Sequence, residues 1–310
     1  MSLCEVRVPT YKRPELLKRA LDSLIGQTYG NWRALVLDDS PAQEARAVVK
    51  ALNDHRILYQ PHEKNLGRSK NIDYAFYAKT YVDGTYAFVL EDDNYLFPGF
   101  IEENINALNR NQVSIVLRNQ EMRLEKNGAS VPMNTTTRGK WFSHGVYTPQ
   151  QLHTRLFFCE GISNGGLFWN TQTIQSDLQV GEQVEHSWHQ ELFRTLTVQE
   201  KIVFEPTPLC VFTEFERTYK KLNLSPKHNR GTQSILIYLV KRYGNAIVHD
   251  AQKLAIAQDV QPVLERKLLN AFYLKYPFQQ TGKIESLSIL TKSLARYYFY
   301  KDPFKQLLVV

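Results

Sequence analysis

The stretch VPTYKRPELLKRALDSLIGQTYGNWRALVLDDS, residues 8–40, decides the fold class. It begins at the end of a short strand, and Pro14 follows at a position suited to the first residue of a helix. Apolar residues then recur at helical spacing and give this helix one apolar face. The next apolar run, residues 32–37, leads into Asp38-Asp39. This run predicts a buried strand with two carboxylates at its carboxyl end.

The alternation of strand and helix continues outward from this stretch. We expect strands over residues 5–9, 32–37, 57–59, 86–90 and 113–117, and helices from residue 14 and over 41–52, 67–78 and 98–109. This spacing is typical of βαβ units, so it predicts an α/β fold with a mostly parallel sheet covered on both faces. Ligands of such sheets bind beyond the carboxyl ends of the strands, at a topological switch point.

The second half of the chain has a weaker pattern. We expect a polar loop over residues 121–145, a Gly-rich turn within 161–169 and a helix over 184–197. Residues 202–213 predict one strand, and Pro206 and Pro208 favour the edge of the sheet for it. Further helices are expected over 233–243, 246–258, 261–276 and 285–300.

Charge is distributed unevenly along the 310 residues. Residues 1–216 carry 22 Lys and Arg against 26 Asp and Glu, whereas residues 217–310 carry 16 against 5. This asymmetry predicts two parts, an α/β domain over 1–216 and a basic helical C-terminal region over 217–310. The basic region suits a peripheral membrane contact or a phosphorylated acceptor, and a helical cap on the α/β domain is the plainer alternative. We expect no nucleic-acid partner.

The sequence shows no signal for secretion or for a membrane-spanning helix. No run of 18 apolar residues predicts a membrane-spanning helix, and the first residues do not resemble a secretory signal. Three widely spaced cysteines, Cys4, Cys159 and Cys210, favour reduced thiols over a disulfide framework or a zinc site. We therefore expect a cytoplasmic protein.

The tetrad Glu91-Asp92-Asp93-Asn94 directly follows an apolar strand. Three acidic groups at one strand end repel one another, and a divalent cation such as Mn²⁺ or Mg²⁺ would relieve this repulsion. The alternative is an acidic turn that caps the helix beginning near Pro98.

Two other segments carry polar groups at strand ends. Asp38-Asp39 suits hydrogen bonding to a base or ribose, although it also suits the cap of the next helix. The segment NLGRSKN, residues 65–71, places Arg68 at a helix N-terminus, where phosphate oxygens are favoured.

Taken together, these segments resemble a known family. VPTYKRPELLKRALDSLIGQTYGNWRALVLDDS, NLGRSKNIDYAF and VLEDDNYLFPGF, in this order, resemble inverting family 2 glycosyltransferases of the GT-A fold. The resemblance is clear over residues 3–110 and looser to about 215. It implies a nucleotide site made by Pro9, Thr10, Tyr11, Asp38, Asp39, Arg68, Asp92 and Arg230. It also implies a metal site made by Glu91, Asp93 and His228, in which Glu91 departs from the usual Asp.

The acceptor side is less well specified. The segment GISNGGLFW, residues 161–169, resembles the Gly-containing acceptor segment of the family, in which Gly165 and Gly166 would let a substrate approach the backbone closely. The family's usual Glu-Asp pair is replaced by GEQVEHSWHQELFRTL, in which Glu185, His189 and Glu191 are all candidate bases. The sequence does not choose among these three.

The resemblance implies a metal-dependent transfer of a sugar from a nucleotide diphosphate donor, with UDP-sugar first, to a hydroxyl acceptor. The acceptor class would be a bacterial polysaccharide or a lipid-linked glycan. Two alternatives remain open: a nucleotidyltransferase, for which the PTYKRP loop lacks the usual glycine, and a non-catalytic module that binds sugar nucleotides or glycans.

Overall fold

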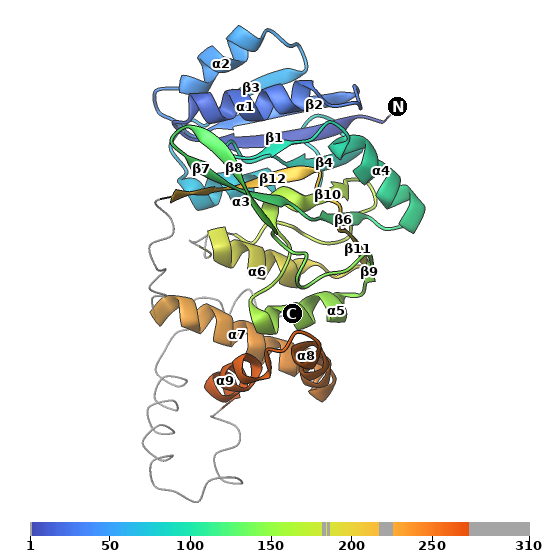
Figure 1. The fold of residues 1–310 in the computed structure, drawn as a ribbon. Coiled ribbons are helices and arrows are strands. Elements are labelled where there is room, and N and C mark those ends of the chain that lie inside the picture. Colours follow the sequence, from blue (N-terminus) through green and yellow to red (C-terminus); the bar gives the residue numbers. More distant parts are fainter. Residues whose placement is uncertain (1, 182–183, 185–186, 217–225, 273–310) are drawn as a thin grey trace, which may run out of the picture. The chain divides into compact units, whose positions relative to one another are not determined.

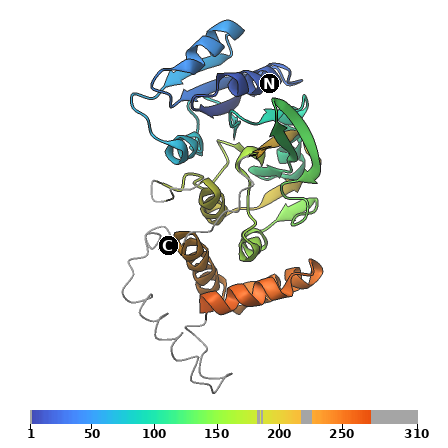
Figure 2. The same cartoon turned by 60° about the vertical axis from the view of Figure 1, so that its left-hand side comes forward.

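A computed structural model describes residues 2–181, 184, 187–216 and 226–272. The chain divides into two compact units: residues 1–149 with 162–222, and residues 150–161 with 223–310. Figures 1 and 2 show both units in two views. The predicted helix over 285–300 lies outside the described residues.

The first unit contains a large eight-stranded sheet in the order β3-β2-β1-β4-β10-β6-β11-β9 (Figure 1). The strands are β1 (Cys4–Thr10), β2 (Trp32–Asp38), β3 (Ile57–Pro61), β4 (Tyr86–Val89), β6 (Ile115–Arg118), β9 (Gly145–Tyr147), β10 (Leu167–Asn170) and β11 (Ile202–Glu205). Strands β3, β2, β1 and β4 pair in parallel, as do β6 and β11, whereas β10 and β9 are antiparallel to their neighbours. The α/β prediction with a mostly parallel sheet is confirmed.

Helices connect and cover the strands of this sheet. They are α1 (Pro14–Ile25), α2 (Glu44–Leu52), α3 (Arg68–Ala75), α4 (Phe100–Asn111) and α6 (Ser187–Thr197). Leu17, Leu21 and Leu24 make the buried face of α1, as the apolar spacing predicts. Phe88 of β4 stacks on Phe168 of β10 with ring centroids 5.6 Å apart, so the core continues through the antiparallel strand.

Among the helix boundaries that differ from the prediction, those of α2 and α3 have local reasons. Helix α2 begins at Glu44 and not at residue 41, because the Ser40 carbonyl accepts a turn hydrogen bond from Gln43, which adopts φ +55°. Helix α3 ends at Ala75 and not at residue 78. The carbonyl groups at and beyond its end bind a side chain from β1 instead of continuing the helix.

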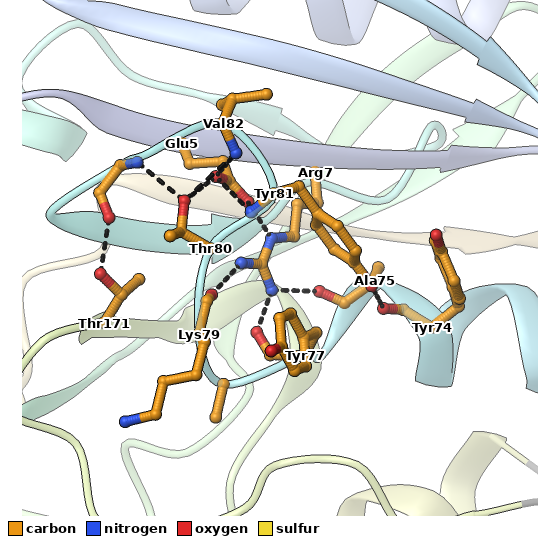
Figure 3. A network of polar contacts seen from close by, with 12 residues as sticks. Glu5, Arg7, Tyr74, Ala75, Tyr77, Lys79, Thr80, Tyr81, Val82 and Thr171 are labelled. Carbon is orange, nitrogen blue, oxygen red and sulfur yellow. Dashed lines mark hydrogen bonds and ion pairs between the residues drawn. The ribbon is translucent and has the colours of Figure 1, made fainter.

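That side chain is Arg7, which is fully buried together with Glu5 (Figure 3). Arg7 Nε lies 2.7 Å from Glu5 Oε1, and its other nitrogens donate to the carbonyls of Ala75, Tyr77 and Lys79. Glu5 in turn accepts the backbone N–H groups of residues 81 and 82. The ion pair on β1 therefore holds the whole connection from α3 to β4.

The prediction of a loop over residues 121–145 is wrong. Strands β7 (Glu121–Lys126) and β8 (Ala129–Thr136) form a hairpin, green in Figures 1 and 2, that joins β5 (Tyr95–Leu96) and β12 (Cys210–Phe215) in a second sheet ordered β5-β12-β7-β8. Asn127 and Gly128 both have positive φ, 52° and 75°, as a two-residue type I′ turn requires. All side chains of both strands are partly or fully exposed. Met122 and Leu124 alternate with charged residues in β7, but this run is short, and the polar residues around it favoured a loop.

The strand expected over residues 202–213 is interrupted at its prolines, but the edge location expected for it is wrong. The prolines separate β11 from β12, and the two strands belong to different sheets. Strand β11 lies between β6 and β9, and β12 lies between β5 and β7. Pro206 and Pro208 therefore stand in the connection, where no ladder hydrogen bond is needed.

The second unit is helical where it is described. It contains α5 (Pro149–Thr154), the 3-10 turn η1 (Arg155–Phe158), α7 (Pro226–Tyr243), α8 (Asn245–Ala257) and α9 (Gln261–Phe272). Leu239, Ile247 and Leu264 are buried between these helices, and His153 Nδ1 lies 2.9 Å from the Tyr243 hydroxyl.

The three cysteines of the chain are free thiols. A search of the described helices finds none long and apolar enough to cross a membrane.

Candidate active site

The site lies at the carboxyl end of β1. The strand order of the sheet reverses there, because β2 lies on one side of β1 and β4 on the other. Thr10 is the last residue of β1, and its hydroxyl donates to Asp92 Oδ2 at 2.8 Å. The Thr10 carbonyl accepts the backbone N–H of Asp39 at 3.1 Å. The acidic segments that follow β2 and β4 thus meet at Thr10, at the switch point of the sheet.

Asp92 is a buried carboxylate that ties down the loop after β1. Besides the Thr10 hydroxyl, it accepts the backbone N–H of Tyr11 at 3.3 Å. Burial and the charge of Asp93 raise the pKa of Asp92 to about 6, although Arg13 and the two hydrogen bonds act in the opposite direction. Asp92 therefore has a positioning role: its hydrogen bonds hold the loop after β1 in place.

Asp93 points toward two arginines of the first loop and helix. Arg13 Nη1 lies 2.6 Å from Asp93 Oδ2 and 3.3 Å from Asp92 Oδ1. Arg19 Nη2 donates to the Asp93 carbonyl at 2.8 Å, and Arg19 Nη1 lies 2.7 Å from Glu125 of β7. Sequence reasoning did not single out Arg13, although it stands in the loop that follows β1.

Glu91 is half-buried, and its Oε2 accepts a 3.3 Å hydrogen bond from Asn94. Burial raises the pKa of Glu91, as do the negative charges of Asp93 and Glu191, while Arg68 lowers it. Arg68 and Glu191 therefore lie near enough to Glu91 for their charges to act on its carboxylate. The structure therefore brings together predicted residues from β4, α3 and α6.

Asp39 holds the loop that begins α3. Its carboxylate accepts the backbone N–H groups of Leu66 and Gly67 at 2.6 and 2.9 Å and the Asn65 amide at 3.0 Å. Gly67 adopts φ +84°, which glycine tolerates, and precedes Arg68. This arrangement fixes the start of α3, and with it the backbone of Arg68.

Asp38 lies behind Asp39 and faces away from it. Its Oδ1 accepts the Ser40 N–H at 2.9 Å, and its Oδ2 accepts the Tyr59 hydroxyl at 2.9 Å. Both side chains are buried, Asp38 at 1% and Asp39 at 3% exposed, so their hydrogen-bond partners distinguish them. Of the two carboxylates predicted for the base, Asp39 is therefore the one directed to the site loop.

The candidate bases differ in their surroundings. His189 of α6 is 3% exposed, whereas Glu191 is half-buried. Glu191 Oε1 accepts the Asn164 N–H at 2.9 Å, and its Oε2 lies 3.1 Å from Arg138. Glu185 lies outside the described residues, and so do the side chains of His228 and Arg230 at the start of α7.

A second buried ion pair was missed from the sequence. Arg194 of α6 is 0% exposed, and its Nη2 lies 3.0 Å from Asp73 Oδ1 of α3. Asp73 also accepts the N–H groups of Val180 and Gly181, and Arg194 Nη1 donates to the Asn164 side chain at 2.6 Å. This pair links α3, α6 and the segment that leads toward residue 185. No local pattern indicated it, because its members are 121 residues apart.

Two glycines form the turn between Asn164 and β10. A Cβ on Gly166 would lie 2.3 Å from the Arg118 carbonyl, and a Cβ on Gly165 would lie 2.7 Å from Gln120 Nε2. The predicted role for these glycines was close approach of a substrate. The structure shows that they first permit close approach of β6 and its following residues.

The donor set suits a hard divalent cation. Carboxylate oxygens of Glu91 and Asp93 are ligands that Mg²⁺ and Mn²⁺ prefer, and the mutual repulsion at Glu91 favours a positive charge there. Among the described residues, no group of three or more His, Cys, Asp or Glu side chains is arranged to hold a metal ion. Glu91 and Asp93 would supply two carboxylates, so a cation held there would need its remaining ligands from a substrate or from water.

The family profile described as "Glycosyl transferase family 2" matches residues 5–167, which include the Thr10 junction, the tetrad and the glycine turn. This chain belongs to glycosyl transferase family 2. The resemblance seen in the sequence is thereby confirmed.

Curated relatives of this family 2 chain are named as sugar transferases. The UDP-Glc:alpha-D-GlcNAc-diphosphoundecaprenol beta-1,3-glucosyltransferase WfgD of Escherichia coli is 26% identical over 122 residues, covering 39% of this chain and 46% of WfgD. Glycosyltransferase GlyA of Streptococcus pneumoniae is 27% identical over 117 residues, covering 37% of this chain and 16% of GlyA. The family 2 chain therefore matches less than half the length of these relatives.

The fold of the family 2 chain is also similar to a solved structure. TarS of S. aureus, residues 1–349, aligns with a TM-score of 0.60 at 17% identity, covering 99% of this chain and 81% of that one. TarS has also been solved with UDP and with UDP-GlcNAc. At this identity the likeness establishes the GT-A fold.

Proposed function

We propose that this family 2 chain is a divalent-cation-dependent, inverting glycosyltransferase that moves a sugar from a UDP-sugar to a hydroxyl acceptor. The observation that carries the proposal is the junction at Thr10, which joins the acidic segments after β2 and β4. Nucleotides bind beyond the carboxyl ends of parallel strands at such a switch point. The UDP complexes of TarS and the UDP-Glc donor named for WfgD support a uridine nucleotide.

The nucleotide would lie over the ends of β1 and β2. Tyr11 is 43% exposed and offers an aromatic face to the base, while Pro9 and Thr10 shape the strand end beneath it. The Asp39 carboxylate has three hydrogen bonds from the 65–67 loop, and about four acceptor positions in all. It therefore keeps one position for a base N–H. Arg68 is the first residue of α3, and its charge acts on Glu91, so it is suited to the phosphates.

Glu91 and Asp93 would hold the Mn²⁺ or Mg²⁺ ion. When bound, the ion would neutralise the charge that develops on the departing diphosphate. His228 remains a predicted further ligand, and Arg230 a predicted diphosphate contact; both side chains lie outside the described residues.

We assign the role of general base to Glu191. Of the three predicted bases, it is the one whose described carboxylate reaches the predicted acceptor segment, where its Oε1 accepts the Asn164 N–H at 2.9 Å. In the proposed step, Glu191 accepts the proton of the acceptor hydroxyl, and that oxygen forms a bond to the anomeric carbon. The bond from this carbon to the diphosphate oxygen breaks on the opposite face, which inverts the configuration. Buried His189 has no proton-transfer role in this mechanism.

The acceptor is proposed by analogy to be a hydroxyl of a glycan or of a lipid-linked glycan. The name of WfgD specifies a sugar carried on diphosphoundecaprenol. The basic C-terminal region would suit a diphosphate-bearing acceptor at a membrane surface, and its last 38 residues, 273–310, lie outside the described residues.

The test is release of UDP from a panel of UDP-sugars with Mn²⁺, with and without lipid-linked and oligosaccharide acceptors. Acceptor-stimulated UDP release from one donor, with an inverted linkage in the product, supports the proposal. Nucleotide binding without release on any acceptor would indicate a binding module, and pyrophosphate release from a nucleoside triphosphate with a sugar phosphate would indicate a nucleotidyltransferase.

A further inference from the structure

Arg13 contacts the carboxylate of Asp93, which is the proposed ligand of the divalent cation. Its Nη1 is 2.6 Å from Asp93 Oδ2 and 3.3 Å from Asp92 Oδ1, so one guanidinium nitrogen contacts two of the three tetrad acids. The Arg13 side chain is 40% exposed, whereas Asp93 and Asp92 are 17% and 8% exposed. Arg13 therefore lies on the solvent side of the carboxylates.

We propose that Arg13 is the resident counter-charge of the tetrad and that it competes with the divalent cation for Asp93. This inference rests on the proposed function, because it concerns the same cation site. A guanidinium and a divalent cation repel each other and cannot both contact Asp93 Oδ2 at full strength. Metal binding therefore requires Arg13 to leave that oxygen.

The contacts of Arg13 allow it to leave. Within the described part of the chain, the two tetrad carboxylates are its side-chain hydrogen-bond partners, and its other contact is the Phe215 ring at 5.8 Å. Arg19 is held differently, by the Asp93 carbonyl, Glu125 and the Tyr95 ring at 5.0 Å. Arg19 thus supports the tetrad backbone, while Arg13 holds the carboxylates through a half-exposed side chain.

This arrangement links cation binding to nucleotide binding. Without UDP, the cation has to displace Arg13 and gains only carboxylate oxygens. With UDP, the cation gains diphosphate oxygens, and the displaced guanidinium gains a new anionic partner. Each ligand should therefore strengthen the binding of the other, and part of this coupling should depend on Arg13.

The experiment is calorimetric titration of MnCl₂ into the full chain, with and without UDP, at constant ionic strength. The variants are Arg13→Gln, Asp93→Asn, the double variant, and Lys18→Gln as the matched control. Lys18→Gln removes the same charge from the neighbouring helix turn, where Lys18 pairs with exposed Asp22. Circular dichroism and the melting temperature confirm that each variant is folded.

We expect Arg13→Gln to bind Mn²⁺ alone about fivefold more tightly than wild type, the strength of a partly exposed ion pair. The strengthening of Mn²⁺ binding by UDP should be smaller in this variant. Lys18→Gln should match wild type, and the Arg13→Gln effect should vanish when Asp93→Asn is also present.

Two failures can be told apart. Mn²⁺ affinity that is unchanged or weaker in folded Arg13→Gln, or a gain that persists with Asp93→Asn, overturns the role of Arg13 and leaves the proposed function intact. Absence of Mn²⁺ binding in wild type and in all variants, with UDP present, overturns the cation site of the proposed function and this inference with it.

Discussion

Thr10 and Asp92 are 82 residues apart in the chain and are joined by a hydrogen bond of 2.8 Å between the threonine hydroxyl and Oδ2 of the aspartate. The bond closes the gap between the ends of β1 and β4, which are adjacent parallel strands. It positions the loop from Tyr11 to Arg13 against the acidic tetrad. The proposed nucleotide and cation sites are both built on this junction.

Asp93→Ala should abolish cation-dependent chemistry. Loss of this carboxylate removes the proposed direct ligand, and we expect transfer and donor hydrolysis to fall at least about a hundredfold. The measurement is UDP release with Mn²⁺ and with EDTA. Asp22→Ala removes an exposed carboxylate of α1 and should be neutral. Full, EDTA-sensitive activity in Asp93→Ala would rule out Asp93 as the ligand.

Glu191→Gln should lower kcat by roughly 10²–10⁴ while the KM for the donor changes little, because a general base acts on the acceptor. Glu185→Gln is the matched comparison, since both changes remove one carboxylate from the same segment. Glu191 also holds Arg138 and the Asn164 N–H, so the melting temperature of each variant must be measured. A large kcat loss in Glu185→Gln, with Glu191→Gln nearly active, would transfer the base to Glu185.

Glu5→Gln should destabilise the first unit and alter its acid response. Burial alone would raise the pKa of Glu5, but Arg7 and the hydrogen bonds from Thr80, Val82 and Tyr81 outweigh burial and lower it. Removing one charge of a buried pair costs about 3–5 kcal/mol. Urea unfolding at pH 7 measures this loss against wild type.

The sign of the pH effect follows from the lowered pKa of Glu5. Its stabilisation is fully present above the unfolded pKa of about 4.3 and is lost as pH falls through the lower folded value. The difference between wild type and Glu5→Gln should therefore be constant above about pH 5 and shrink toward pH 3. A difference that grows on acidification would contradict this account.

Gly166→Ala should disturb the glycine turn. Its new methyl group would lie 2.3 Å from the Arg118 carbonyl, and neither backbone can yield easily. We expect a loss of about 1–3 kcal/mol in stability and weaker acceptor binding. Gly30→Ala is the control, because nothing lies within 4 Å of the added Cβ there. Equal stability of the two variants in urea unfolding would show that the turn relaxes without cost.

The parts of the fold that depend on local pattern could be predicted. The apolar runs of β1, β2 and β4 and the amphipathic spacing of α1 are local properties, and they gave the order of the βαβ units. The β7–β8 hairpin was missed because the segment is polar and its strands have no buried residue. Asn127-Gly128, flanked by the alternating residues Met122, Leu124, Val131 and Met133, is a hairpin signal that sequence reasoning could have used. The end of α3 was misplaced because Arg7, 68 residues away, takes the Ala75 carbonyl.

The sequence by itself determined the alternation of strands and helices, the acidic tetrad at a strand end and the family to which the chain belongs. Only the tertiary structure decided which charges meet: Arg13 with Asp93, Arg138 with Glu191, and Arg194 with Asp73. The physical reason is that periodicity depends on neighbours along the chain, whereas an ion pair depends on how the strand order folds distant segments together. Arg13, the proposed competitor of the cation, could therefore be identified only from the folded structure.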